Sequence, residues 1–358
     1  MVISMVKFNS ILTGKYCMLF YVIVVSCIVY ILLQFYRTTL IPKFKTLLSN
    51  RVTKNNTTYY YYHSSSYNKT ILEPNVSLYY HYATSDRNSS YPFISGDTFR
   101  AFSDYVYDEI RNDNLSSVKY GDIVFVKTDM LPSFFNSSFN SIRVPFVLVT
   151  HNSDDPATGR YVKYLRNPKI LHWYASNLNV KNLQKISPIP IGLANTRWPQ
   201  GNLDNITFAF KNYRKPWSQR TTFLYVNFAV RTNTVKRTKA LSQASTIKDV
   251  QIVKEKITFE TYLEQIGNSK FVLSPPGNGL DCHRTWEALL MGAVPIVLRS
   301  GLDPLFSKTR SIIIKDWSKL SYKFLSSFNF SLDNNYVPDV LYAEYWRETL
   351  FKYRKKVD

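Results

Sequence analysis

Residues 271–298 read FVLSPPGNGLDCHRTWEALLMGAVPIVL. This stretch opens with an apolar run, passes through a turn rich in proline and glycine, and then shows helical spacing over residues 285–291. Gly292 stands where a helix-terminating glycine belongs, and the apolar run at 295–298 predicts a second strand. A strand, a helix and a strand in this order form a βαβ unit, so the stretch predicts a parallel sheet covered by helices.

The turn and the first helical turn carry the chemistry of this stretch. Gly277 and Gly279 let the backbone approach a ligand closely, and the free N–H groups at a helix start favour a phosphate. His283 and Arg284 add donors there, and Glu287 follows on the same helix face, where a carboxylate can accept both hydroxyls of a ribose. The pattern predicts a nucleotide site, although it matches neither a Walker motif nor G-x-G-x-x-G. The alternative is a tight turn followed by a surface ion pair.

Residues 274–297, SPPGNGLDCHRTWEALLMGAVPIV, resemble the donor-binding signature of exostosin-like glycosyltransferases with a GT-B fold. A weaker resemblance runs over about 121–237 and includes FVLVTHNSDDP, KILHWYASN and PIPIGLANTRW. The resemblance implies an α/β protein with two Rossmann-like lobes built on parallel sheets. It implies that Glu287 holds the donor ribose and that Arg284 and the glycine turn lie near the diphosphate. The implied donor is a UDP-sugar, with a GDP-sugar as the alternative, and the acceptor is a glycan or a glycoprotein.

A second basic helix start follows the expected strand at 222–228. Arg237 lies in it and would reach the donor diphosphate from the side opposite Arg284. A solvated helix start explains this arginine equally well.

An inverting sugar transfer needs a base for the acceptor hydroxyl. Asp129, His151, Asp154 and Asp155 are the candidates, and His151 and Asp154 rank first because they follow the end of an expected strand. The alternative is a turn capped by Asn and Asp side chains. No Asp-x-Asp occurs, so we expect no metal ion; basic groups would neutralise the leaving diphosphate. No cofactor is expected beyond the nucleotide-sugar co-substrate.

The composition sets the remaining alternatives. The chain has 358 residues, a formal net charge of +20 and 45% hydrophobic residues, enough for two lobes with a large core. The charge admits nucleic acid as a partner, but the sequence shows no zinc spacing and no recognised nucleic-acid module, so we expect none. A non-catalytic, membrane-tethered glycan- or nucleotide-binding protein is the alternative to an enzyme.

Residues 16–36, YCMLFYVIVVSCIVYILLQFY, carry no charge and are long enough to span a bilayer. We expect an uncleaved signal anchor, with a cleaved signal peptide as the alternative. More lysines and arginines follow this run closely than precede it, which argues against a lumenal C-terminal part. Nine N-x-S/T sequons, all after the run, argue for it. The expectation is a single-pass type II protein of the Golgi or endoplasmic reticulum lumen. The sequon asparagines are Asn55, Asn56, Asn68, Asn75, Asn88, Asn114, Asn136, Asn205 and Asn329.

The expected organisation is a tail at 1–15, the signal anchor at 16–36, a stem at 37–95, an acceptor lobe at 96–205 and a nucleotide-sugar lobe at 206–358. Cys282 is the only cysteine beyond the anchor, so no disulfide within the lumenal part is expected. Expected strands lie at 122–127, 144–149, 170–174, 186–191, 222–228, 271–273, 295–298 and 312–314. Expected helices lie at 99–110, 236–241, 259–266, 285–291 and 342–353.

Overall fold

The computed structural model describes residues 52–54, 57–59, 86–157, 159–180, 183–330 and 336–354. The predicted tail, the predicted signal anchor and the predicted stem as far as residue 85 lie outside these ranges, except for an antiparallel pair of strands, β1 (Val52–Lys54) and β2 (Thr57–Tyr59). Within the described ranges, no helix combines the length and the apolar character needed to cross a membrane.

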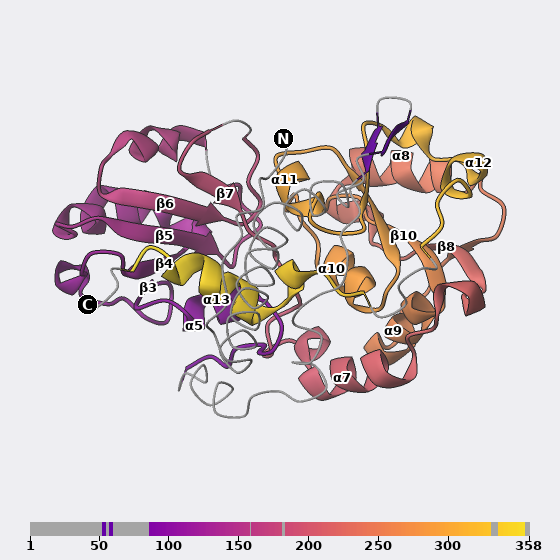
Figure 1. The fold of residues 1–358 in the computed structure, drawn as a ribbon, viewed down its shortest axis with the longest axis horizontal. Helices are drawn as coiled ribbons and strands as arrows, with labels where there is room; N and C mark the ends of the chain where they lie inside the picture. Colours follow the sequence, from indigo (N-terminus) through magenta and orange to yellow (C-terminus); the bar gives the residue numbers. More distant parts are fainter. Residues whose placement is uncertain are drawn as a thin grey trace, which may run out of the picture. The chain divides into compact units, whose positions relative to one another are not determined.

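Two parallel sheets of five strands each organise the described residues (Figure 1). The α/β class and the two parallel sheets predicted from the sequence are confirmed. The first sheet has the order β3-β4-β5-β6-β7, with strands Tyr105–Tyr107, Ile123–Lys127, Phe146–His151, Ile170–Ala175 and Ile186–Pro188. The second has the order β12-β11-β10-β8-β9, in which β8 to β12 are Thr222–Val226, Val250–Ile252, Ser269–Leu273, Val294–Leu298 and Ile312–Ile314.

The α-helices are α5 (Gly96–Ala101), α6 (Leu131–Ser133), α7 (Leu203–Asn212), α8 (Thr234–Ala244), α9 (Phe259–Gly267), α10 (His283–Leu290), α11 (Asp303–Phe306), α12 (Tyr322–Leu325) and α13 (Ala343–Phe351). Segments of other helical types are Leu115–Ser117, Thr128–Met130, Phe134–Ser138, Phe139–Ser141, Gly159–Arg166, Pro199–Gly201, Trp217–Gln219, Val230–Thr232, Trp317–Lys319 and Asp339–Leu341.

Both faces of the first sheet are covered, which explains why its central strands are apolar at successive positions. On one face, the ring of Phe135 lies 6.0 Å from that of Trp173. On the other, Trp346 of α13 contacts Phe99 of α5 at 5.5 Å and Tyr174 of β6 at 6.5 Å. Helix α13 follows the second sheet in the chain but lies beside the strands of the first (Figure 1). The last helix of the predicted C-terminal lobe therefore packs against the N-terminal lobe.

The second sheet is also covered on both faces, by α8 and α9 (Figure 1). Leu224 and Phe271 share one apolar cluster with Ala240 of α8. Tyr225 and Val272, the next residue along each strand, lie in the other cluster, which extends into the first lobe. Because successive strand residues point to opposite faces, this alternation places α8 and the first lobe on different sides of the sheet.

The predicted helix over 99–110 is wrong. Helix α5 ends at Ala101, and Tyr105–Tyr107 forms the edge strand β3. Asp104 and Asp113 hold this segment extended: Oδ2 of Asp104 accepts the N–H of Ile123 at 2.9 Å, and Oδ2 of Asp113 accepts that of Val106 at 2.8 Å. The apolar spacing fits a helix, but these long-range contacts favour pairing with β4.

The folded lobe begins before residue 96, within the predicted stem. Tyr91, Phe93 and Ile94 are buried in the core, and Phe93 forms an antiparallel bridge with Tyr342. A short apolar segment of this kind gives no helical period, so its burial depends on the returning C-terminal chain.

Candidate functional site

The start of α10 lies directly after the glycine-rich turn that follows β10. Its N-cap residue, Cys282, makes no side-chain hydrogen bond to the first helical turn. Helices α7, α8 and α9 have such a cap, from Asn202, Asn233 and Thr258, whereas α13 has none. The N-cap side chain therefore provides no acceptor for the first N–H groups of α10, which carry the partial positive charge of a helix start and favour an anion.

Two glycines are required by the close packing of this turn. A Cβ atom at Gly277 would lie 2.7 Å from Nη2 of Arg237, and one at Gly279 would lie 3.0 Å from the side-chain amide of Asn177. The absent side chains thus let an arginine from α8 and an asparagine after β6 approach the turn from two sides.

Arg237 and Arg284 both contact the ring of Phe228, with guanidinium carbons 5.4 and 5.3 Å from its centroid. Nε of Arg237 donates to the carbonyl of Pro276 at 3.0 Å, and Nε of Arg284 donates to that of Asn227 at 2.9 Å. Arg237 is 5% exposed, and burial and the charge of Arg284 lower its pKa. Among the described residues, neither arginine has a carboxylate within 4 Å. Two cations that form no ion pair within the described part of the chain favour an anionic ligand.

Glu287 lies one turn into α10 and is 6% exposed. Its Oε2 accepts a hydrogen bond of 2.6 Å from the hydroxyl of Tyr262 on α9. Burial raises the pKa of Glu287, opposed by the Tyr262 bond and by the charges of His283 and Arg284. Burial also raises the pKa of Tyr262 well above its ordinary value, so the phenol is the donor. Within the described chain, Oε1 has no hydrogen-bond partner, so it is free to accept a ligand hydroxyl.

Arg237, Arg284 and Glu287 line one cavity of about 480 Å³, which is called the main cavity below. The donor-binding residues predicted from the sequence all line it: Gly277, Gly279, His283, Arg284, Glu287 and Arg237. Phe259 and Tyr262 of α9 line it as well. Cys282, the free cysteine of the described chain, is a further lining residue, and burial raises the pKa of its thiol. The cavity thus has a cationic, glycine-rich part and a part with an aromatic and a carboxylate side chain.

Asp281, which sequence reasoning did not single out, joins the two lobes. Its Oδ2 accepts the N–H of Ile191 at 2.8 Å and the indole N–H of Trp286 at 2.9 Å. Its own N–H donates to Oδ1 of Asn177 at 2.8 Å. Burial raises the pKa of Asp281 to about 6, opposed by these N–H donors. The glycine-rich turn is therefore held against the first lobe through residues about 90 positions earlier in the chain.

His151, predicted as a base, is 2% exposed, and both of its ring nitrogens have partners. Nδ1 accepts the N–H of Asn152 at 2.7 Å, which leaves Nε2 to donate to the carbonyl of Pro190 at 3.0 Å. Burial lowers its pKa to about 4. This geometry suits a neutral structural histidine, because neither nitrogen remains for a substrate proton.

Asp154, the other predicted base, is exposed and lines the main cavity. Its Oδ2 accepts a hydrogen bond of 3.3 Å from the side-chain amide of Asn278 in the glycine-rich turn. Asp154 and His283 also line a second cavity of about 250 Å³, which adjoins the first. His283 donates from Nδ1 to the carbonyl of Gly192 at 2.8 Å, so it too connects the two lobes.

No family model matches this chain. The resemblance to exostosin-like glycosyltransferases therefore depends on the quoted residues alone. Sequence reasoning missed Tyr262, Asp281 and Asn177, because each acts through a partner 25 or more positions away in the chain.

Proposed function

We propose that the protein is a glycosyltransferase that transfers a sugar from a nucleotide-sugar donor to a glycan or glycoprotein acceptor. The main cavity carries this proposal, because it combines two arginines that lack an acidic partner among the described residues with a carboxylate one helical turn away. A nucleoside diphosphate presents the matching groups in the same order: two phosphates, then a ribose with two hydroxyls.

Each part of the cavity has a role in this proposal. The start of α10, Arg237 and Arg284 bind the diphosphate and stabilise the charge that develops as it leaves. Oε1 of Glu287 accepts a ribose hydroxyl while Tyr262 holds Oε2. Phe259 and Tyr262 supply apolar surface for the nucleobase of the donor. The donor is a UDP-sugar, with a GDP-sugar as the alternative, and arginine charge takes the place of a metal ion.

Asp154 is the proposed base, since it is exposed and lines both adjoining cavities. His151 is the weaker candidate, because its two nitrogens are already engaged. The quoted resemblance and the two parallel sheets support a GT-B-like arrangement of the exostosin-like type.

Sequons support a lumenal, type II topology for this enzyme. All five sequon asparagines within the described ranges are exposed: Asn88, Asn114, Asn136, Asn205 and Asn329. Exposure is what a glycan acceptor site requires.

The test is a panel of UDP- and GDP-sugars offered to the full-length protein, with released nucleoside diphosphate and tight donor binding measured separately. Release that rises when a glycan acceptor is added supports the enzyme. Tight binding without release supports the non-catalytic alternative. No binding of any donor contradicts the enzyme and the nucleotide-binding alternative, and leaves only a glycan-binding protein. Arg231→Ala is the matched control, because Arg231 is exposed and does not line the main cavity.

A further inference from the structure

The second cavity lies at the carboxyl end of β5, next to the main cavity. Its wall contains the side chains of Asn152, Asn195 and Trp198, and Asp154 and His283 lie at its boundary with the main cavity. The proposed donor site uses none of the first three residues, so this cavity needs its own explanation.

A closed ring of hydrogen bonds joins two residues of the cavity wall, Asn152 and Asn195, to Asp97. The N–H of Asp97 donates to Oδ1 of Asn195 at 2.8 Å, Nδ2 of Asn195 donates to Oδ1 of Asn152 at 3.1 Å, and Nδ2 of Asn152 donates to Oδ1 of Asp97 at 2.9 Å. An amide nitrogen carries two hydrogens, and each of these amides uses one within the ring. Within the described ranges, the second N–H of Asn152 and of Asn195 has no partner, so each can donate to the hydroxyl of a ligand.

The ring holds a strained residue. Asn152 has a φ of +60°, a conformation that an asparagine adopts at a cost. Gly96 lies directly against it, since a Cβ there would be 1.8 Å from Oδ1 of Asn152. The surrounding chain thus fixes the direction of this amide, which is the arrangement expected where orientation matters to a ligand.

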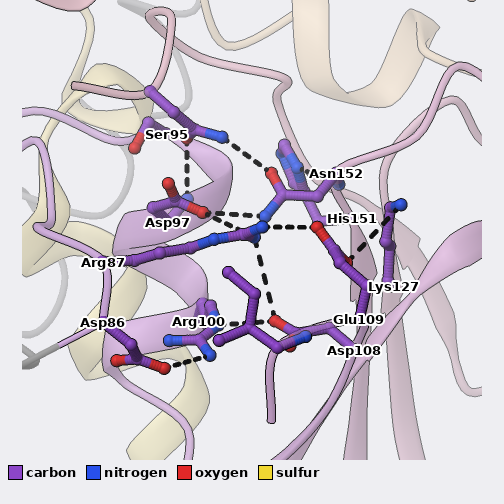
Figure 2. Close-up of polar contacts among 12 residues, drawn as sticks. Asp86, Arg87, Ser95, Asp97, Arg100, Asp108, Glu109, Lys127, His151 and Asn152 are labelled. Atoms are coloured by element: carbon purple, nitrogen blue, oxygen red, sulfur yellow. Dashed lines mark hydrogen bonds and ion pairs between the residues drawn. The ribbon is translucent and has the colours of Figure 1, made fainter. Parts of the chain in front are cut away.

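A network of charged side chains contacts the Asp97 member of the ring (Figure 2). Arg87 pairs with Asp97 at 3.5 Å and with Glu109, and Arg100 donates from Nε to Asp108 at 2.6 Å. All but Glu109 are buried. Burying ion pairs contributes little net stability, because desolvation offsets the attraction between the charges. The network instead fixes Asp97, and through Asp97 the two amides.

An exposed aromatic ring lies at the mouth of the cavity. Trp198 is 55% exposed, and the guanidinium of Arg197 lies 5.7 Å from its ring centroid. A pyranose has an apolar C–H face and a rim of hydroxyls. An indole face beside fixed amide donors matches both parts of such a sugar.

We propose that the second cavity binds the terminal pyranose of the glycan acceptor, stacked on Trp198 and hydrogen-bonded to Asn152 and Asn195. This inference depends on the proposed transferase function for the reaction, though not for the binding itself. The acceptor oxygen forms a bond to C1 of the donor sugar while the bond from C1 to the diphosphate breaks. The electron pair leaves with the nucleoside diphosphate, and the acceptor proton moves to the carboxylate of Asp154.

Saturation-transfer NMR with the full-length protein tests this. The probes are oligosaccharides that end in glucose, galactose, xylose, N-acetylglucosamine or glucuronic acid, and UDP and GDP are titrated in parallel. Trp198→Ala should weaken binding of the recognised glycan roughly tenfold, from the loss of a stacking contact, and should leave UDP affinity unchanged. Trp198→Phe should restore most of it. The control is Phe208→Ala on α7, since Phe208 is 50% exposed and lies outside both cavities.

The outcomes separate the two proposals. Glycan affinity that is equal in wild type and Trp198→Ala overturns the stacking site. UDP binding with no glycan binding also overturns it and leaves the donor site standing. Glycan binding that depends on Trp198, without binding of UDP or GDP, supports the second cavity and contradicts the transferase. Binding of neither a glycan nor a nucleotide overturns both.

Discussion

The hydroxyl of Tyr262 donates a 2.6 Å hydrogen bond to Oε2 of Glu287, and this bond joins α9 to α10. It fixes the rotation of the carboxylate and leaves Oε1 as the atom available to a ligand. The specificity of the proposed ribose contact thus depends on a residue 25 positions earlier in the chain.

We expect Glu287→Gln to weaken uridine and UDP binding roughly 10- to 100-fold, because a charge-assisted hydrogen bond contributes about 1.5–3 kcal/mol. Isothermal titration calorimetry measures the change. Glu264→Gln, on the exposed face of α9, should leave affinity unaltered. Normal uridine affinity together with a much lower melting temperature would show that Glu287 is a structural residue and that the ribose binds elsewhere.

Tyr262→Phe should have a smaller effect of a different kind. Removing the hydroxyl frees the carboxylate to rotate, so the preference for uridine over 2′-deoxyuridine should shrink, while the apolar surface of the ring remains. Titration of both nucleosides against wild type and variant gives the ratio directly. An unchanged ratio would show that Tyr262 does not position Glu287.

Arg284→Ala should separate phosphate binding from nucleoside binding. Losing one charged donor should weaken UDP roughly 10- to 100-fold and uridine hardly at all. Arg237→Lys is the milder variant at the second arginine, because the Arg237 guanidinium also donates to Pro276 and Ala229 and an alanine would loosen the turn. Equal losses for uridine and UDP would argue against a diphosphate between the arginines.

The proposed type II membrane topology can be tested by N-glycosylation. Treating the protein from secretory cells with an N-glycosidase should lower its apparent mass, because the described sequon asparagines are exposed. Asn136→Gln and Asn205→Gln should each remove one increment where those sites are used. An unchanged mass in every case would contradict a lumenal domain.

Local patterns in the sequence predicted the βαβ unit well. The continuous apolar runs at β4, β5 and β10 are the strands expected of a sheet covered on both faces, and the glycine after α10 ends that helix as expected. The same reasoning failed at β3, where the spacing of Phe99, Phe102 and Val106 fits a helix but pairing with β4 decides the outcome.

Whether a site residue could be predicted depends on whether its role is local in the sequence. Those in one contiguous motif, such as Arg284 and Glu287, could be found from spacing. Asp281 and Tyr262 could not, because their roles come from partners on other elements. His151 lies at the carboxyl end of a strand, close to the expected position, but sequence does not show that its two nitrogens would be engaged by the backbone.

The buried state of His151 predicts a pH-dependent stability. Its folded pKa of about 4 lies below the ordinary value of 6.5, so the folded state binds fewer protons than the unfolded state between these values. The contribution is fully present above pH 6.5 and is lost as the pH falls to 4, and it amounts to about 3 kcal/mol. Asp281 opposes it: its folded pKa of about 6 lies above 3.8, so its contribution is lost as the pH rises through 6.

A non-titrating variant isolates the histidine from this opposing carboxyl. His151→Gln keeps one acceptor and one donor, and Asp281 titrates equally in both proteins. Urea unfolding at pH 7 and pH 4 should show that wild type loses more stability than His151→Gln over this interval, with a difference of about 3 kcal/mol. Equal losses would mean that His151 carries its proton in the folded state, and its role as a base would then deserve a direct test by the pH profile of sugar transfer.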